Sequence, residues 1–228
     1  MFRMLRLKPP HGWNAVAWEL GIVVLGVLIA LGAQQIAENL HWRRELADFR
    51  VALRAEASDD LGTYVYRNGQ NRCVAARLDE LQRWLDSWRA GRPTRLTGPI
   101  GVPASLIVRT NVWDSRDADT IAHMPLDEKL EYGYLYTEFA NNEVHRLDER
   151  GAWLELASFE GATDLDHQDL MRLQGLIIRA RLRDFRMTDN ARRFSRRAAK
   201  MGLTPRIDPD WPRPLSEICR RILAGAAT

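Results

Sequence analysis

The chain has 228 residues, enough for one domain with an extension, and 46% of them are hydrophobic, which suffices for a buried core. Its 33 Lys and Arg residues nearly balance its 30 Asp and Glu residues, so the formal net charge is only +3. This balance excludes a protein that coats polyanions through its overall charge, and it excludes a long acidic solvating chain. Any charged surface with a function therefore has to be local.

The first apolar run predicts a transmembrane helix. A tail with three basic residues precedes it, and between positions 15 and 33 only Glu19 is charged. At the rise of an α-helix these positions extend over about 28 Å, close to the ~30 Å hydrocarbon thickness of a bilayer. We therefore predict a cytoplasmic tail over residues 1–14 and a transmembrane helix over residues 15–36.

A cleavable signal peptide is the main alternative for this segment. A basic start precedes an apolar stretch, and the small residues around Leu31 resemble a cleavage site. The charge of Glu19 inside the stretch, and apolar residues that continue through Ile36 and Leu40, favour an uncleaved anchor. A soluble core helix is less favoured, because residues 22–31 are apolar on all sides.

The orientation of the span is only weakly indicated, since basic residues flank it on both sides. A short basic tail before a first apolar segment usually stays in the cytoplasm. We therefore predict a single-pass protein of the bacterial inner membrane, with residues 37–228 in the periplasm.

Helical spacing places small residues and one acid along one face of the span: Glu19, Gly26, Ala30 and Ala33. Such a face lets transmembrane helices approach closely, so the expected partners are membrane lipid and a second copy or another membrane protein. Gly and Ala are also common in spans for no specific reason. Glu19 lies near the helix start, where it would cap the helix or contact a partner, and both interpretations stay open.

The remaining residues predict an all-α fold: the N-terminal transmembrane helix followed by a soluble bundle of about four to five helices. The expected elements are a helix over 37–68, a helix over 71–90, a loop over 91–109, helices within 110–159, a basic helix over 164–201 and a C-terminal helix over 214–224. Pro125 is expected to begin the second part of 110–159, with core contacts from Leu130, Tyr134, Phe139 and Val144. Thr163 or Asp164 is expected to cap the basic helix.

The segments "WELGIVVLGVLIAL" and "RRELADFRVALRAE" are similar to an uncharacterised group of bacterial membrane-anchored proteins, domains of unknown function whose span begins with Glu and a VVxG pattern. Further on, "TNVWDSRDADTIAHMP" and "LEYGYLY" resemble the Trp-containing turn and aromatic helix of that group. Members commonly carry Asn-Asn-Trp-Asn after the span, where this chain has Gln34 and Gln35. The resemblance implies an anchored helical architecture and no catalytic residues.

The two cysteines, Cys73 and Cys219, lie far apart and lack a CxxC partner, which excludes a zinc ribbon and a thioredoxin-type motif. Their state depends on the compartment. In an oxidising periplasm they would form one disulfide, and in a cytoplasm they would be two small buried side chains.

The helix over 164–201 carries the strongest local charge asymmetry. The candidate basic patch on it consists of Arg179, Arg183, Arg186, Arg193, Arg196 and Arg197. This patch would bind anionic headgroups or an acidic partner, or nucleic acid if the domain were cytoplasmic. The alternative is a solvated face whose arginines pair with acids of other helices, and we do not expect nucleic-acid binding.

No pattern predicts chemistry. The five histidines stand alone, no nucleophile or phosphate-binding motif occurs, and the acids of "DSRDAD" are placed to cap a helix after Trp113. We therefore predict no catalytic residue, no metal and no cofactor. The expected role is an interaction or scaffold module. The alternatives are an anchored sensory bundle that binds a ligand, disfavoured by the short tail, and a tethered nucleic-acid binder.

Overall fold

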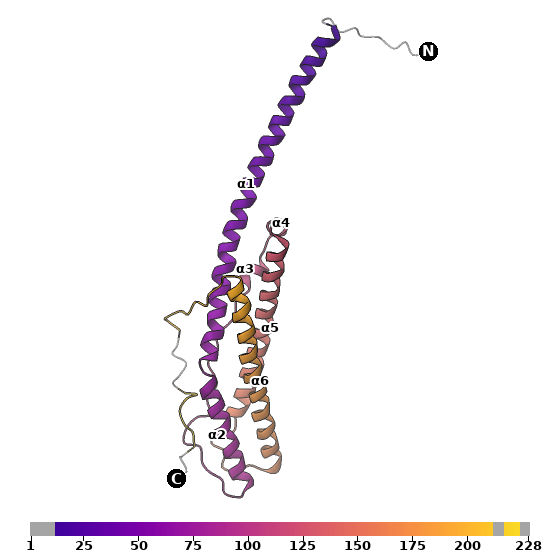
Figure 1. The fold of residues 1–228 in the computed structure, drawn as a ribbon. Helices are drawn as coiled ribbons and strands as arrows, with labels where there is room; N and C mark the ends of the chain where they lie inside the picture. The colour runs from indigo at the N-terminus through magenta and orange to yellow at the C-terminus, as the bar shows by residue number, and fades with distance from the viewer. Residues whose placement is uncertain (1–11, 212–216, 224–228) are drawn as a thin grey trace, which may run out of the picture. The chain divides into compact units, whose positions relative to one another are not determined.

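The computed structural model describes residues 12–211 and 217–223, which form helices and connecting segments without any strand. This confirms the predicted all-α fold. The helices are α1 (Gly12–Asn68), α2 (Asn71–Arg89), α3 (Asn111–Asp114), α4 (Ala118–Ala122), α5 (Leu126–Ala157) and α6 (His167–Lys200), shown in Figure 1. Most of the predicted tail, residues 1–11, lies outside the described residues.

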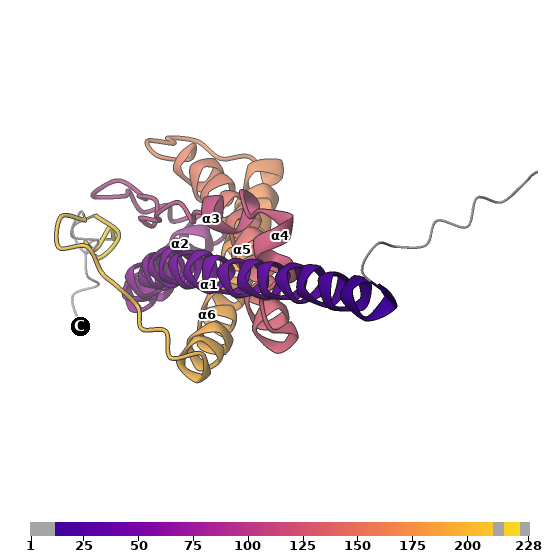
Figure 2. The same cartoon turned by 90° about the horizontal axis from the view of Figure 1, so that it is seen from above.

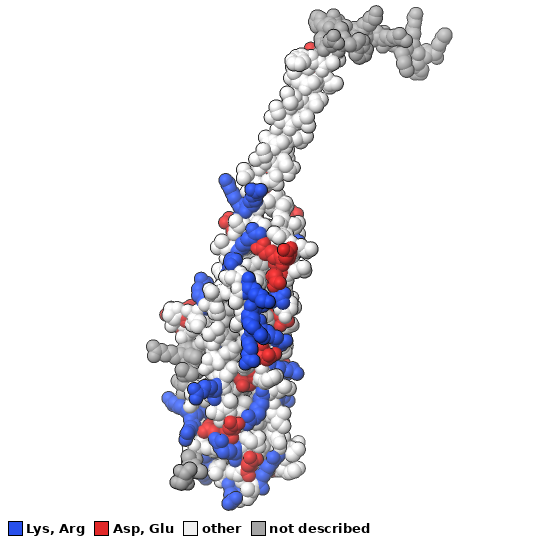
Figure 3. Space-filling model, in the orientation of Figure 1, with Lys and Arg blue, Asp and Glu red and all other residues white. Residues whose placement is uncertain are grey.

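The chain divides into two compact units, Met1–Arg50 and Val51–Thr228. The first contains the N-terminal part of α1, which covers the predicted transmembrane helix, and its described side chains from residue 16 to residue 40 are exposed. Within the described residues, one helix near the N-terminus is long and apolar enough to cross a membrane, a property that a signal sequence shares. Figure 3 shows this stretch as a white surface almost free of charged side chains.

The second unit is a helical bundle. A turn of two residues, Gly69 and Gln70, joins α1 to α2, and the long helices α5 and α6 pack beside them (Figure 1). Buried residues of α2, α5 and α6 form the main core, with Trp84, Trp153 and Leu176 among them. The helical periods in the sequence place these apolar side chains on the inward faces.

An aromatic cluster joins the last part of α1 to α5 and α6. The ring of Tyr64 lies 6.0 Å from Phe139 and 5.3 Å from Phe194, and all three side chains are buried. Aromatic rings at these separations contribute stability beyond the apolar area that they bury.

A buried arginine crosses the bundle where α1 ends. The side chain of Arg67 is 2% exposed and forms a two-point ion pair with Glu149 of α5, with 2.9 Å between Nε and Oε2. It also donates to Asp184 of α6 at 3.0 Å and to Asn71 at the start of α2 at 2.9 Å. Burial lowers the pKa of Arg67, but the two carboxylates outweigh it and the net shift is upward. This charged network therefore links four helices at one level.

The chain after α6 returns along α1. Helix α6 is followed by Gly202, whose φ of 68° lies in the left-handed region. The N–H of Arg206 then donates to the carbonyl of Ser58 at 2.8 Å, and a Cβ atom at Gly62 would lie 1.9 Å from the Arg206 carbonyl oxygen. Only glycine fits at position 62. Figures 1 and 2 show this segment (yellow) beside α1 and α2, away from α5.

The structure differs from the sequence prediction at the C-terminus. The described part of the helix predicted over 214–224, residues 217–223, forms turns, and residues 212–216 lie outside the described residues. The reason is that the carbonyl groups of Glu217, Ile218 and Arg220 accept hydrogen bonds from the side chain of Arg77. The Arg77 side chain thus holds this segment as turns, with a backbone hydrogen bond from the Arg220 N–H to the Glu217 carbonyl at 3.1 Å.

Two smaller expectations about α5 and α6 are also wrong. Helix α6 is capped by Asp166, which forms a capping box with Asp169, instead of by Thr163 or Asp164. On α5 the expected start after Pro125 is correct. Of the four expected core residues only Phe139 is buried, whereas Leu130, Tyr134 and Val144 are exposed.

Replacing Arg67 by Met should lower the free energy of unfolding by about 3–5 kcal/mol, because Glu149 and Asp184 then stay buried without their cation. Adding Glu149→Met and Asp184→Leu removes the stranded carboxylates and should restore at least half of the loss. Denaturant unfolding of the detergent-solubilised chain measures both effects. The control is Arg181→Met, which breaks an exposed ion pair with Asp79 and should cost less than about 1 kcal/mol.

Candidate functional site

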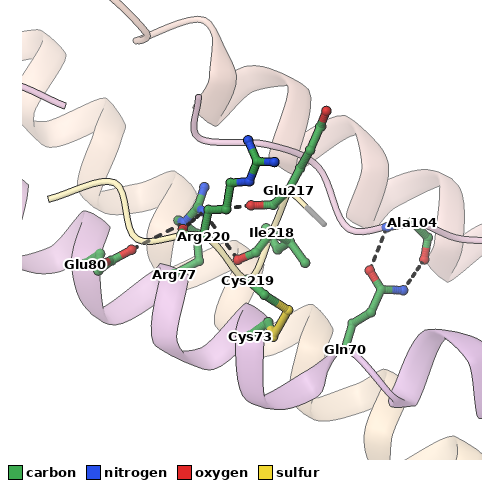
Figure 4. Close-up of a disulfide and its surroundings, with 9 residues drawn as sticks. All are labelled: Gln70, Cys73, Arg77, Glu80, Ala104, Glu217, Ile218, Cys219 and Arg220. Carbon is green, nitrogen blue, oxygen red and sulfur yellow. Dashed lines mark hydrogen bonds and ion pairs between the residues drawn. A yellow bond between two sulfur atoms is a disulfide. The ribbon is translucent and has the colours of Figure 1, made fainter. Parts of the chain in front are cut away.

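The C-terminal segment is held against α2 by a disulfide. Cys73, in the first turns of α2, is bonded to Cys219, and their Cα atoms are 4.7 Å apart (Figure 4). The bond closes a loop between residues separated by 146 positions. Next to it, Ile218 and Ile222 are buried in the main core. The described C-terminal residues are thus part of the packed domain.

Arg77, one turn after Cys73, binds the backbone on both sides of the disulfide. Its guanidinium donates to the carbonyls of Pro99, at 2.8 Å, and Ile100 in the loop after α2. It also donates to three carbonyls of the C-terminal segment: Glu217, Ile218 and Arg220 (Figure 4). Burial lowers the pKa of Arg77, and the nearby carboxylate of Glu80 opposes that shift. The side chain acts as a junction between two irregular segments.

Sequence reasoning missed Arg77 and Glu80, although a signal was present. Both lie on the apolar face of α2 with Val74, Leu78 and Leu81, at the spacing that places a charged pair inside the core. Glu80 accepts a hydrogen bond from the N–H of Ile222 at 3.3 Å and lies 3.5 Å from Nε of Arg77. A charged pair at buried helix positions indicates that both side chains bind other groups. Here they form hydrogen bonds with backbone carbonyl and N–H groups.

Outside this junction lies a groove of about 1200 Å³ between α2, the loop that follows it and the C-terminal segment. Five arginines line the groove without an ion pair or side-chain hydrogen bond to any described residue: Arg72, Arg83, Arg95, Arg220 and Arg221. Guanidinium groups bind carboxylates and phosphates through two parallel hydrogen bonds. The groove is therefore suited to an anionic group.

The predicted basic patch on α6 is mostly paired with carboxylates. Four of its six arginines form ion pairs: Arg179 with Glu155, Arg183 with Asp148, Arg193 with Asp189 and Arg197 with Glu131. Arg197 also lies over the ring of Tyr134, 3.8 Å from its centroid. Only Arg186 and Arg196 have no such partner among the described residues. Figure 3 accordingly shows blue and red atoms interspersed over the domain, which favours the solvated-face interpretation.

The acids of "DSRDAD" act locally. The side chain of Asp117 caps α4 by accepting from the N–H groups of Asp119 and Thr120, as predicted, and Asp114 accepts a hydrogen bond from the Thr110 hydroxyl at 2.6 Å. Across the described ranges, no three His, Cys, Asp or Glu side chains converge on a point where they could hold a metal ion.

The predicted transmembrane interaction residues Glu19, Gly26, Ala30 and Ala33 all lie exposed on α1, and a Cβ atom at Gly26 would meet open space. The structure therefore places no described side chain against this face. Its role in association stays a prediction.

A buried carboxylic acid in α1 also escaped sequence reasoning. Asp60 is 2% exposed, and its Oδ1 accepts a hydrogen bond from the N–H of Arg109 at 2.8 Å. Its Oδ2 is buried with no hydrogen-bond partner in the part of the chain that is described. Burial raises the pKa of Asp60 to about 8, with smaller upward effects from Glu56 and Asp59, so the side chain is mostly protonated at pH 7.

The comparisons with known proteins leave these sites without a precedent. No family model matches the chain, and neither a curated protein nor a solved structure matches it. The resemblance to the uncharacterised membrane-anchored group therefore stays a prediction.

The free energy of unfolding should fall as the pH rises from about 4 to about 8. Asp60 has a folded-state pKa above its ordinary value of 3.8, so folding takes up a proton in this range, and stability is lost at up to ~1.4 kcal/mol per pH unit. Asp60→Asn keeps an acceptor for Arg109 and should remove most of this slope. Denaturant unfolding at pH 5 and pH 8 measures it. Asp164→Asn, at an exposed carboxylate in the loop before α6, should leave the slope unchanged.

In the chain isolated from its own compartment without reductant, mass spectrometry should find the Cys73 and Cys219 peptides linked. Cys73→Ser should lower the free energy of unfolding by about 3–5 kcal/mol, because the unfolded chain regains the entropy that the closed loop had removed. The double variant Cys73→Ser/Cys219→Ser should lose no more than Cys73→Ser alone. Two free thiols in the wild-type chain, denatured without reductant, would contradict the pairing.

Proposed function

We propose that this chain is a single-pass protein of the bacterial inner membrane, with a cytoplasmic N-terminus and a periplasmic helical domain that serves as an interaction or scaffold module. One observation carries the proposal: a helix with an unburied apolar surface on all sides precedes a compact domain whose two cysteines are paired.

The exposed apolar surface of α1 supports an anchor. Large apolar side chains between residues 16 and 40 are between 39% and 64% exposed: Val16, Leu20, Ile22, Val23, Val24, Leu25, Val27, Leu28, Ile29, Leu31, Ile36 and Leu40. Soluble proteins rarely expose so large an apolar surface, and a bilayer would cover it. Helix α1 also continues without a break through the stretch around Leu31 that resembles a cleavage site. The exposed apolar surface supports insertion into a membrane, and the unbroken helix favours an uncleaved span over a signal peptide.

The Cys73–Cys219 pair supports the periplasmic side, because disulfides persist in oxidising compartments and are rare in the cytoplasm. The second candidate function is a ligand-binding, sensory role. The specific observation in its favour is the groove lined by five arginines that have no partner among the described residues, which suits an anionic ligand. An interaction module remains the leading proposal, because the residues around the groove also hold the C-terminal segment in place.

Reporter fusions after the last residue test the proposed topology. Alkaline phosphatase at the C-terminus should be active, and a fluorescent protein that folds only in the cytoplasm should be dark. Fractionation should then recover the intact chain, with its N-terminal residues, in the membrane.

A fluorescent C-terminus would contradict the proposed topology and support the tethered nucleic-acid binder. A soluble periplasmic product that begins after residue 30 would show that the apolar segment is a signal peptide.

A further inference from the structure

Helix α6 carries a row of exposed apolar side chains on the side away from the core. Met171, Ile178, Leu182 and Phe185 are between 48% and 68% exposed. Their spacing of seven, four and three residues keeps them on one face of the helix. The buried residues of the same stretch, Leu173, Leu176, Ile177 and Ala180, lie on the opposite face.

Helix α5 carries a second row of this kind. Val144, Leu147 and Leu154 are between 52% and 58% exposed, at spacings of three and seven residues. The core side of this stretch holds Trp153 and Leu156, which are fully buried. Three of the five large apolar residues between positions 144 and 156 of α5 thus face away from the protein interior.

Exposed ion pairs between the helices place both rows on the same side of the α5–α6 pair. Glu155 of α5 pairs with Arg172 and Arg179 of α6, and Asp148 pairs with Arg183 at 2.8 Å. Because these pairs are exposed, they lie in the outer groove between the two helices. The outer face, defined here by the two apolar rows and the ion pairs between them, is continuous. It belongs to α5 and α6, which pack side by side (Figures 1 and 2).

The outer face is large enough for a stable interface. At about 180 Å² for a fully exposed large apolar side chain, its seven apolar residues expose about 700 Å², more than the largest patch of most monomers and close to the ~800 Å² that each partner buries in a standard complex.

One glycine interrupts each row, Gly151 on α5 and Gly175 on α6. A Cβ atom would meet nothing within 4 Å at either position. Glycine inside a helix costs up to about 1 kcal/mol relative to Ala, and nothing within the described chain requires it here. The missing side chains leave a notch in each row, and a close approach of another helix to these notches accounts for both glycines.

The charges beside the rows determine which helices can face each other. On the sides that line the groove between the two helices, Asp148 and Glu155 border the row on α5, whereas Arg172, Arg179 and Arg186 border the row on α6; the exposed Arg150 lies on the other side of the α5 row. Placing α5 on α6 of a second copy brings these acids, which already pair with arginines of their own copy, next to arginines of the other copy. Placing α5 on α5 and α6 on α6 sets like charges against each other, which is unfavourable.

A two-fold axis parallel to the helices gives the favourable arrangement. It keeps every residue at its own level. The ion pairs of Glu155 with Arg172 and Arg179, and of Asp148 with Arg183, place Leu154 within one helical turn of Gly175, and Gly151 within one turn of Ile178. A large side chain of one copy then faces a glycine of the other on both helices. The axis also leaves Val51, the first residue of the helical domain, at the same end in both copies. Two copies anchored in one membrane require this; the membrane anchor itself rests on the proposed function.

We propose that the helical domain binds a second copy of itself through the outer face, with α5 of each copy on α6 of the other. The contact is isologous and closed, because each copy contributes the same surface. The scaffold module is then a dimer, and its core contact is a four-helix layer with Gly151 and Gly175 as the points of closest approach.

Cysteine cross-linking between two full-length chains tests this pairing. Chains with Leu154→Cys and chains with Gly175→Cys, each with a different tag, are co-expressed, and copper-phenanthroline is added to isolated membranes. We expect a covalent species of both tags in the mixed sample and at least tenfold less in each single variant alone, because equal positions lie apart. Ile107→Cys, 67% exposed and outside the face, controls for random collisions.

A lack of cross-linking above the Ile107→Cys level would overturn the proposal, as would efficient cross-linking of Leu154→Cys with itself, which indicates α5 on α5. Adding Gly151→Leu to both chains should reduce the cross-link at least fivefold without lowering the melting temperature, because the notch is open within one copy. An unchanged cross-link would also overturn it. Since the oxidant is added, these outcomes do not depend on the compartment of the domain, which the reporter fusions determine separately.

Discussion

The buried guanidinium of Arg67 is the constraint on which the arrangement of the helices depends. A cation that is 2% exposed needs its counter-charges at fixed positions, and Glu149 of α5 and Asp184 of α6 provide them. Apolar contacts allow helices to slide by a fraction of a turn, whereas a two-point guanidinium–carboxylate pair does not. Asn71 extends the network by donating to the Thr188 hydroxyl at 2.8 Å. The end of α1 and the start of α2 are thereby set in register with α5 and α6.

Arg77 solves a related problem for segments that have no regular structure. The loop after α2 and the C-terminal residues cannot pair their backbone groups in a helix or sheet, and buried carbonyls without donors are costly. One guanidinium satisfies five of them, Gln70 satisfies both backbone groups of Ala104, and the disulfide adds a covalent link. Arg77 and the two disulfide cysteines also line the arginine-rich groove, so ligand binding there would act on the attachment of the C-terminus.

The sequence was a good guide to the helices and a poor guide to their polar contacts. The 3.6-residue period and the turn residues predicted α2, α5 and α6 to within a few residues at most ends, because local patterning determines them. The wrong C-terminal helix and the missed roles of Arg67, Arg77 and Asp60 have another cause. Each depends on groups more than 20 residues away in the chain, and periodicity contains no information about such contacts. The burial of Asp60, for example, becomes visible only when Arg109 is placed beside it.

The misassigned residues of α5 show what periodicity leaves undetermined. Leu130 and Val144 have the spacing of core residues, yet the core of this helix is formed by another face with Tyr136, Phe139 and Trp153. When a helix carries apolar residues on two faces, a bundle of this size buries only one of these faces, and the other stays exposed to solvent. In its interior, the bundle has charged side chains, Arg67, Arg77 and Glu149, at positions that apolar side chains could fill. Outside, it leaves leucines, an isoleucine and a phenylalanine in water. Such a distribution is costly for a lone domain and becomes favourable once a surface of matching shape and opposite charge covers the outer rows.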